Sequence, residues 1–480
     1  MPKSSVNIDT PLVIDLDGTL LKSDLLIETG VLFLTDWPFQ VGKLCNWLLQ
    51  GKLMLKKNLA ETTNLDVSTL PYNKTVLDLI TVERSKGRKI ILATGSYKSL
   101  AFKIAEYLGL FDDVIASNHK QNVVGKRKCE ILVEKYGKKG FDYLGNSNED
   151  LMVWEQASKA LGVNVSKATR RKSKLYCDLK ELHAEKRSFG LLLLKAMRLH
   201  QWLKNILIFV PLFAAHAYNN NGLMFDAIIA WFAFGLCASS IYLFNDLVDI
   251  KNDRQHKTKR MRPFASGELS ALIGIIYIPI LLIMSFLISF YLLSFNFINI
   301  LILFFLITLV YSLFLKKLII FDVMTLALLY TLRLIAGAYA VNVSLSFWIL
   351  AFSMFIFMSL AIVKRYAEIK MISRPESSEK IPGRGYFSTD LPVLLSLGVA
   401  SGYTAVLVFA LYVNDPATMD QFTQPKLIWL SCPILFVWIS RVWMLTHRGL
   451  MLSDPVVFAA KDKLSLSMFL LLGILFWFAT

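Results

Sequence analysis

Cysteine is scarce in this chain, and its few cysteines follow no recognisable pattern. Neither metal-ligand spacing nor a disulfide framework connects the five residues, which are Cys45, Cys129, Cys177, Cys237 and Cys432. We therefore expect these cysteines to be free thiols, either in a reducing compartment or buried inside the fold. The first residues, MPKSSVNIDTP, are polar and lack the apolar stretch of a secretory signal. We therefore expect the first domain to stay in the cytoplasm.

Long apolar runs are absent from the first part of the chain and dominate the rest. Hydrophobic residues make up 55% of the 480 residues, and the mean hydropathy of +0.50 indicates a membrane protein. The net charge of +16 does not indicate a nucleic-acid partner, because the basic residues cluster at the ends of the apolar runs. We expect no nucleic-acid binding and a multi-pass protein of the inner (cytoplasmic) membrane.

About nine apolar runs are long enough to cross a bilayer, at roughly 20 residues per span. They cover residues 203–218, 222–244, 270–293, 296–315, 319–341, 345–363, 391–412, 425–446 and 464–480. The linkers 217–222 and 293–299 contain no Lys or Arg, whereas alternate linkers, such as 251–262, are strongly basic. The positive-inside rule places the basic linkers in the cytoplasm, on the side expected for the first domain.

Three carboxylates follow the second apolar run. Asp246, Asp249 and Asp253 stand at i, i+3 and i+7, a spacing that puts them on one face of a helix. Carboxylates are costly at a membrane boundary unless they bind something. Hard oxygen ligands suit Mg²⁺, which usually binds through a few carboxylates and the phosphates of a substrate. Basic residues follow within 251–262, so the segment predicts a site for Mg²⁺ and a phosphorylated substrate.

The pattern N-D-x-x-D-x-x-x-D from Asn245 to Asp253, with Arg262-Pro263 and Gly267 after it, resembles the UbiA superfamily of intramembrane prenyltransferases. The resemblance covers residues 190–480 and implies an all-α bundle of nine transmembrane helices that binds Mg²⁺-diphosphate. Within the superfamily the chain is most similar to decaprenyl-phosphate phosphoribosyltransferases. The segments that carry this likeness are R-x-x-Q-W-x-K-N from Arg198 to Asn205, Tyr311-Ser312 with Lys316, Asp322 with Leu332-Arg333, and Lys364-Arg365 with Glu368.

The chain departs from ordinary prenyltransferases in its second acidic motif. Asp322 stands alone where the family often has D-x-x-x-D, and Arg333 follows about three helical turns later. A cation-lined pocket fits a donor with more than one phosphate group, such as 5-phosphoribosyl diphosphate. The expected substrate-binding residues are Asn245, Arg198, Lys204, Lys257, Arg260, Lys316, Asp322, Arg333, Lys364 and Arg365. The basic residues at span ends have an equally simple alternative role as helix anchors at the inner leaflet.

The soluble part begins with an apolar strand-like run, LVIDLDGTL at residues 12–20. It ends in Asp15-x-Asp17-Gly18-Thr19, and a carboxylate at a strand's C-terminal end lies where open α/β sheets bind ligands. This pattern resembles the first motif of the haloacid dehalogenase (HAD) phosphatases. The resemblance implies an α/β, Rossmann-like domain in which Asp15 attacks phosphorus to form an aspartyl-phosphate and Asp17 is the acid/base.

Three more segments match the HAD motifs in chain order, over about residues 10–165. Thr94 ends a strand-like run, and Lys128 is the candidate cation, with Lys126 as the runner-up. Asn146 and Asp150 match the metal-binding motif, in which the family usually has Asp at the position of Asn146. The amide oxygen of Asn can bind Mg²⁺ but carries less negative charge than a carboxylate. We therefore expect this departure to weaken turnover and not to change the fold. The implied metal set is Asp15, Asp17, Asn146 and Asp150.

We therefore predict a HAD-like domain at 1–165 with a small helical cap near 21–75, a basic linker at 166–188 and a UbiA-like transferase at 189–480. The leading hypothesis is a Mg²⁺-dependent transfer of phosphoribose from 5-phosphoribosyl diphosphate to a polyprenyl phosphate, followed by dephosphorylation of the product. One alternative is a prenyltransferase that acts on an aromatic acceptor. Another is a lipid or ion transporter with a regulatory phosphatase-like domain. The oligomeric state and the polyprenyl length are open.

Overall fold

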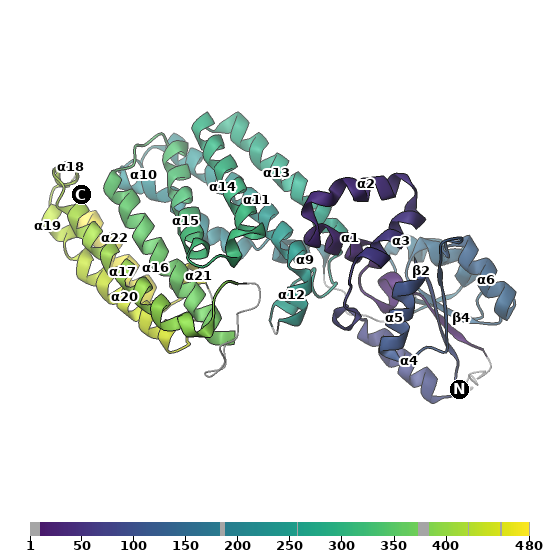
Figure 1. The fold of residues 1–480 in the computed structure, drawn as a ribbon. Helices are drawn as coiled ribbons and strands as arrows, with labels where there is room; N and C mark the ends of the chain where they lie inside the picture. Colours follow the sequence, from purple (N-terminus) through teal and green to yellow (C-terminus); the bar gives the residue numbers. More distant parts are fainter. Residues whose placement is uncertain are drawn as a thin grey trace, which may run out of the picture. The chain divides into compact units, whose positions relative to one another are not determined.

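The computed structural model of the chain describes residues 10–182, 188–256, 258–372, 384–420, 422–451 and 454–479. The chain forms two compact units. The first comprises Met1–Met197 and Leu243–Tyr277, and the second comprises Arg198–Tyr242 and Ile278–Thr480. The first unit contains a β-sheet with surrounding helices, and the second is helical (Figure 1).

The sheet of the first unit has six parallel strands in the order β3-β2-β1-β4-β5-β6. The strands are β1 (Leu12–Ile14), β2 (Ile90–Tyr97), β3 (Asp113–Ser117), β4 (Asp142–Gly145), β5 (Ala160–Val163) and β6 (Leu179–Leu182). The helices that follow them include α4 (Lys74–Ser85), α5 (Lys98–Leu108), α6 (Lys126–Tyr136) and α7 (Leu151–Gln156). This order places the carboxyl ends of β1, β2 and β4 side by side at the centre of the sheet.

The central strands are apolar on both faces, as expected for a parallel sheet covered by helices. Leu12 and Ile14 of β1 pack into one hydrophobic core, whereas Val13 between them packs into another. Ile91 and Ala93 of β2 belong to the same core as Val13. Strand alternation thus divides one short apolar sequence between two cores, which fixes the strand register and the position of Asp15.

The cap lies between β1 and β2 and consists of α1 (Leu25–Asp36), α2 (Val41–Leu49) and α3 (Lys52–Thr62). Its own small core contains Phe33, Leu55 and Leu59. The segment expected to be a basic linker differs from the expectation over residues 166–182. It forms α8 (Lys167–Ser173) and β6, because Leu179 packs into the core under β5 and its strand extends the sheet edge.

The helices outside the α/β domain include seven that are long and apolar enough to cross a membrane, within the described parts of the chain. They are α11 (Asn221–Val248), α13 (Ala271–Leu292), α14 (Phe295–Leu313), α15 (Phe321–Ala340), α16 (Phe347–Ile372), α17 (Leu391–Val413) and the segment Pro425–His447 with α19 (Pro425–Ile428) and α20 (Ser431–His447). Leu199–Ala214, with η5 (Leu199–Phe209) and α10 (Val210–Ala214), is a shorter apolar helix, as is α22 (Lys463–Ala479). The expected count of about nine spans is therefore not confirmed.

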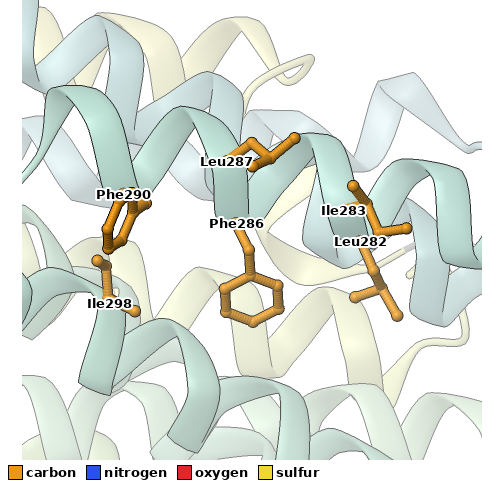
Figure 2. A pocket seen from close by; sticks show the side chains of 6 residues that line it. All are labelled: Leu282, Ile283, Phe286, Leu287, Phe290 and Ile298. Atoms are coloured by element: carbon orange, nitrogen blue, oxygen red, sulfur yellow. The ribbon is translucent and has the colours of Figure 1, made fainter.

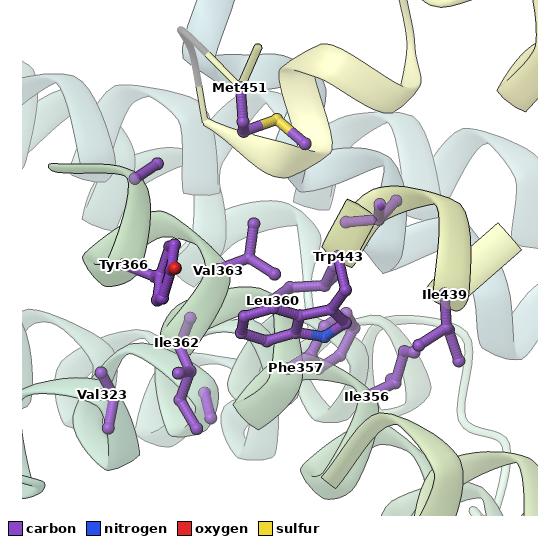
Figure 3. Packing of buried hydrophobic residues seen from close by; sticks show 14 of the residues in the cluster. Val323, Ile356, Phe357, Leu360, Ile362, Val363, Tyr366, Ile439, Trp443 and Met451 are labelled. Atoms are coloured by element: carbon purple, nitrogen blue, oxygen red, sulfur yellow. The ribbon is translucent and has the colours of Figure 1, made fainter. Parts of the chain in front are cut away.

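The core of the second unit lies between α15, α16, α17 and α20. Trp443 of α20 lies among Phe357, Leu360 and Val363 of α16 (Figure 3). Small residues allow the close packing: a Cβ added to Gly398 of α17 would lie 2.1 Å from the Trp443 ring. This packing holds the polar residues of α15 and α16 in fixed positions.

The second unit also has an apolar hollow of about 460 Å³ beside α13 and α14 (Figure 2). Its lining is Leu282, Ile283, Phe286, Leu287, Phe290 and Ile298. These side chains carry no hydrogen-bonding group. The hollow therefore lacks the charged and polar groups that bind phosphate.

Candidate active sites

The first candidate site lies at the carboxyl end of the central strands of the sheet. Asp15 follows β1, and its Oδ1 accepts a 2.7 Å hydrogen bond from Nζ of Lys128 in α6. The Thr19 hydroxyl donates to Oδ2 of the same carboxylate at 3.2 Å. Asp15 and Lys128 are buried, whereas Lys126, the alternative cation, is exposed. Lys128 is thus the lysine that balances the charge of Asp15.

The second carboxylate of the motif is held by the neighbouring strand. Oδ2 of Asp17 accepts a hydrogen bond of 2.6 Å from Ser96 and one of 3.4 Å from Thr94, both in β2. Its Oδ1 accepts from the backbone N–H of Leu25, the first residue of cap helix α1, at 2.8 Å. Gly18 permits the tight turn between the motif and the cap because its φ is +75°. Ser96, which the sequence patterns did not single out, makes the shorter contact.

The third acidic position, Asp150, is held in place by several donors. Its Oδ2 accepts from the backbone N–H groups of Asn146 and Ser147, each at 2.9 Å. The Tyr143 hydroxyl donates to Oδ1 at 2.7 Å, and Nζ of Lys128 lies 3.9 Å from the same oxygen. The side chain of Asn146 fills the space over Gly18, where an added Cβ would lie 2.1 Å from Nδ2. The site therefore brings together the residues of all the matched motifs.

Burial controls protonation in this site. Desolvation raises the pKa of Asp15 to about 7, although Lys128 opposes the shift. Desolvation also raises the pKa of Asp17 to about 6, and the Asp24 carboxylate adds to the effect. Burial opposes the positive charge of Lys128, but Asp15 and Asp150 outweigh it and raise the pKa of that amine. Asp15 and Asp17 therefore gain from further positive charge beside Lys128.

Lys56 of cap helix α3 is a residue that the sequence analysis missed. Its Nζ donates to the carbonyl oxygen of Gly95 at 2.5 Å and lies 3.4 Å from Oδ1 of Asn122. Gly95 stands between Thr94 and Ser96, so the cap brings a cation to the strand that holds Asp17. Burial lowers the pKa of Lys56. No local pattern distinguishes it from the other lysines of the cap.

The Asp-rich segment forms the second candidate site. The long helix α11 ends at Val248 and the short α12 (Ile250–Gln255) follows, so the three aspartates do not lie on one uninterrupted helix. Backbone hydrogen bonds nevertheless continue from Asp249 to Asn245 and from Asp253 to Asp249. Asp246 and Asp253 both bind Nη1 of Arg262, at 3.1 and 2.6 Å. Two carboxylates of the motif thus converge on one positively charged group.

The donor atoms of this segment fit a divalent cation. Oδ1 of Asn245 is buried and has no hydrogen-bond partner among the described residues. Burial raises the pKa of Asp253 to about 6 although Arg262 opposes the shift, so the carboxyl gains from additional positive charge. Amide and carboxylate oxygens are the ligands that Mg²⁺ prefers. No group of three His, Cys, Asp or Glu residues with metal-binding geometry occurs in the described ranges.

A basic cluster lies in the second unit around a single carboxylate, Asp454. Nζ of Lys204 donates to Oδ2 of Asp454 at 2.6 Å, and Nζ of Lys364 lies 3.4 Å from the same atom. The Tyr330 hydroxyl donates to Oδ1 at 3.2 Å. Asp454 precedes Pro455 and α21 (Pro455–Ala459), and it was not among the expected site residues. Lys204 and Lys364 were expected, and their common partner explains why they lie together.

Arg333 of α15 is buried near this cluster. Its Nε donates to Oδ1 of Asn205 at 3.0 Å, and its guanidinium lies 4.9 Å from the ring centroid of Phe304 and 5.6 Å from that of Tyr330. Within the described ranges it has no carboxylate partner. Nδ2 of Asn205 is also buried without a partner there. A buried guanidinium and a buried amide donor together are suited to an anion.

Asp322 and Arg365 form a separate pair between α15 and α16. Arg365 donates from Nε to Oδ2 at 2.5 Å and from Nη2 to Oδ1 at 2.8 Å, and both side chains are fully buried. The Tyr311 hydroxyl donates to Oδ1 of Asp322 at 2.9 Å, and Arg365 also contacts Glu368. We expected both residues to bind substrate. The bidentate pair instead satisfies each side chain internally, so the geometry favours a structural role.

Four more residues were expected to bind substrate, Arg198, Lys316, Arg260 and Lys257. Arg198 lies 5.4 Å from the ring centroid of Tyr242, Lys316 is half-buried in η7 (Leu315–Lys317), and Arg260 is exposed in η6 (Lys259–Met261). Lys257 lies outside the described residues. Among the expected basic residues, Lys204 and Lys364 thus share Asp454, and Arg333 lies beside Tyr330, which binds the same carboxylate.

Comparison with known proteins identifies the membrane part. The model of the UbiA prenyltransferase family matches residues 206–458, which is more than half of the chain. The chain belongs to the UbiA prenyltransferase family. This membership and the apolar helices make it an integral membrane protein. The predicted order of an α/β domain followed by a helical, UbiA-like membrane region is confirmed, and so is the resemblance to phosphoribosyltransferases.

Three curated proteins are similar to this chain. The uncharacterized protein y4nM of Sinorhizobium fredii is 35% identical over 95% of this chain and 88% of its own length. The nodulation protein NoeC of Azorhizobium caulinodans is 34% identical over 57% of this chain and 88% of its own length. The decaprenyl-phosphate phosphoribosyltransferase of Mycolicibacterium smegmatis is 29% identical over 58% of this chain and 89% of its own length.

Solved structures match the two parts separately. A UbiA homologue from Archaeoglobus fulgidus, bound to DMAPP and Mg²⁺, is 16% identical over 59% of this chain and 98% of that chain, with a TM-score of 0.46. A HAD family hydrolase from Salmonella enterica serovar Typhi is 12% identical over 40% of this chain and 72% of that chain, with a TM-score of 0.28.

Proposed function

We propose that the UbiA part transfers phosphoribose from 5-phosphoribosyl diphosphate to a polyprenyl phosphate. In this reaction a phosphate oxygen of the lipid attacks C1 of the ribose, and the bond from C1 to the diphosphate oxygen breaks. The diphosphate leaves with the electron pair of that bond. The product is a lipid-linked ribose that keeps its 5-phosphate. We place the reaction at the inner membrane, with the α/β domain in the cytoplasm.

The observation that carries this proposal is the surplus of positive charge in the second unit, where Lys204 and Arg333 are buried and Lys364 is half-buried. Lys204 and Lys364 share the single carboxylate of Asp454, and Arg333 has no carboxylate partner among the described residues. Buried charges are costly without counter-ions. A donor with a 5-phosphate and an acceptor with its own phosphate supply more anionic groups than a prenyl diphosphate with an aromatic acceptor. The surplus therefore favours the phosphoribosyl reaction.

Mg²⁺ is the cofactor that we propose for the Asp-rich segment. Asp246, Asp249, Asp253 and the unpartnered oxygen of Asn245 would hold it. When bound, the metal ion supplies positive charge to the diphosphate as that group leaves. Arg262, which binds Asp246 and Asp253, would supply a further positive charge to the diphosphate.

We propose that the HAD-like domain removes the 5-phosphate from the product. An oxygen of Asp15 attacks phosphorus, and the bond from phosphorus to the ribose oxygen breaks. Asp17 gives a proton to the leaving ribose oxygen, and its raised pKa suits this role. Water then hydrolyses the aspartyl-phosphate with Asp17 as the base. Lys128 balances the charge of Asp15, and Asn146 and Asp150 would hold a Mg²⁺ ion that lowers the charge repulsion.

The test uses the purified full-length chain in lipid nanodiscs with Mg²⁺. One arm offers radiolabelled 5-phosphoribosyl diphosphate with decaprenyl phosphate, and the other offers a prenyl diphosphate with an aromatic acid. We expect label in the lipid fraction of the first arm, and no such label with the Asp246→Ala variant. Prenylation of the aromatic acid without phosphoribosyl transfer would identify the chain as a prenyltransferase instead.

A further inference from the structure

The cap of the HAD-like domain and the Asp-rich loop are joined by a buried ion pair. Nη2 of Arg254 donates to Oε1 of Glu28 at 2.6 Å, and Nη1 donates to Oε2 at 3.1 Å. The two side chains are only 6% and 8% exposed. Nε of Arg254 also donates to the carbonyl oxygen of Ala265 at 3.0 Å. Both partners belong to the first compact unit.

The backbone around this pair is closely packed. Gly267, in the loop after the Asp-rich segment, has a φ of +69°, and an added Cβ would lie 2.9 Å from Lys22 and 3.0 Å from Pro71. The Lys22 N–H donates to the Pro71 carbonyl oxygen at 3.0 Å. These two residues stand where the chain passes from the phosphatase core into the cap and back. The loop therefore contacts the junction between the cap and the core.

The ion pair lies close to both candidate active sites in the sequence. Glu28 stands one turn after Leu25, whose N–H donates to Asp17. Arg254 directly follows Asp253 of the Asp-rich segment. Neither Glu28 nor Arg254 has a role in the two proposed reactions. Their pairing is also unlike a solvated surface bridge, because burial makes each charge dependent on the other.

We propose that this pair docks the phosphatase domain onto the Asp-rich loop of the transferase and positions both sites for successive reactions. Glu28 and Arg254 are positioning residues. Docking keeps the phosphatase at a high effective concentration near the lipid product, which spares a diffusional search. The benefit for catalysis rests on the proposed function, whereas the docking itself does not.

Hydrogen exchange of the full-length chain in nanodiscs tests the docking directly. We expect Glu28→Gln and Arg254→Gln each to raise amide exchange in residues 258–269 and in α1 by at least about tenfold, because either change strands a buried charge. The double variant Glu28→Arg with Arg254→Glu should recover much of the protection. As a control, Glu130→Gln removes an exposed pair with Arg127 and should leave exchange unchanged. Unchanged exchange in both single variants overturns the proposal.

Activity separates docking from catalysis. We expect Glu28→Gln to retain hydrolysis of a soluble phosphomonoester, because Asp15 keeps Lys128 and Asp17 keeps its donors in β2. With decaprenyl phosphate and 5-phosphoribosyl diphosphate it should accumulate the 5-phosphorylated lipid several-fold over wild type, and the charge-swapped variant should reverse this. Equal accumulation in wild type and Glu28→Gln overturns the coupling. If neither protein forms a ribosylated lipid, the proposed function fails while the exchange result still decides the docking.

Discussion

At the residue scale, the phosphatase-like site shows how burial sets the chemistry of an aspartate. Asp15 and Asp17 come from one short motif, yet they have different partners. Asp15 binds Lys128, whereas Asp17 binds hydroxyl groups of β2 and a backbone N–H of the cap. Burial raises the pKa of both carboxyl groups, to about 7 for Asp15 and about 6 for Asp17. The partners that accompany this burial differ: an ammonium group for Asp15, and neutral hydrogen-bond donors for Asp17.

The raised pKa values predict how Mg²⁺ binding depends on pH. Carboxylates bind the metal in their deprotonated form, so the apparent affinity should fall as the pH drops through about 7 for Asp15 and about 6 for Asp17. Below pH 7, Mg²⁺ binding should also release protons. Isothermal titration calorimetry in buffers of different ionisation enthalpy measures this release. Affinity and proton release that stay constant from pH 5.5 to 8 would contradict the assignment.

Arg333 is the residue whose replacement best tests the donor site. We expect Arg333→Ala to lower kcat/KM for 5-phosphoribosyl diphosphate on the order of 100-fold, because a buried cation would lose its contact with a phosphate. Arg333→Lys should recover only part of the loss, since lysine cannot make paired hydrogen bonds. The control is Arg441→Ala, which breaks a pair with Asp462 in the last part of the chain. A folded Arg333→Ala variant with wild-type kinetics would remove Arg333 from the site.

At the scale of elements, α15 and α16 are connected by the bidentate pair of Asp322 and Arg365 as well as by apolar packing. The pair explains why a lone aspartate stands at the start of α15. Its geometry serves helix packing, and the pairing leaves little capacity for a second metal ion.

This structural role predicts a loss of stability. Asp322→Asn removes one charge of a fully buried pair and should cost roughly 3 kcal/mol, the lower end for such pairs because Glu368 still contacts Arg365. The double variant Asp322→Leu with Arg365→Met should recover most of it, since an apolar pair replaces the charges. Thermal unfolding of the full chain in detergent measures both. If Asp322→Asn unfolds at the wild-type temperature and transfer stops, Asp322 serves substrate binding instead.

At the scale of the whole molecule, an α/β domain and a UbiA family membrane part occupy one chain, and each supplies its own acidic motif. Asp15 and Asp17 follow a strand of the parallel sheet, and Asp246 lies in the last turn of a membrane helix. No residue serves both motifs. The two activities should therefore respond to separate substitutions.

Asp15→Asn should abolish phosphate release and leave phosphoribosyl transfer within about twofold of wild type, because an amide cannot act as the covalent nucleophile. Its lipid product should keep the 5-phosphate, which mass spectrometry of the extracted lipid detects. The reciprocal control, Asp246→Ala, should keep hydrolysis of a soluble phosphomonoester and lose transfer. Loss of both activities in either variant would mean that the sites depend on each other chemically.

The sequence by itself predicted an α/β domain followed by a helical membrane part, together with the candidate site residues of each. The structure brings together five residues that were picked out from short motifs: Asp15, Asp17, Thr94, Lys128 and Asp150. Such motifs can be recognised because a strand and the carboxylate that follows it are close in sequence. The apolar runs likewise predicted membrane helices. The count of nine spans is not confirmed, because two of the apolar helices in the described parts of the chain are shorter than a full span.

Only the tertiary structure decided which charges meet. Lys204 finds Asp454 across 250 residues, Arg365 finds Asp322 across 43, and Arg254 finds Glu28 across 226. No periodicity encodes such partners, because they depend on how distant elements pack and on the high cost of leaving a buried charge alone. Asp322 is an example: it was expected to bind substrate, and in the structure it forms an ion pair with Arg365. The charged residues could thus be found in the sequence, whereas their partners depend on tertiary packing.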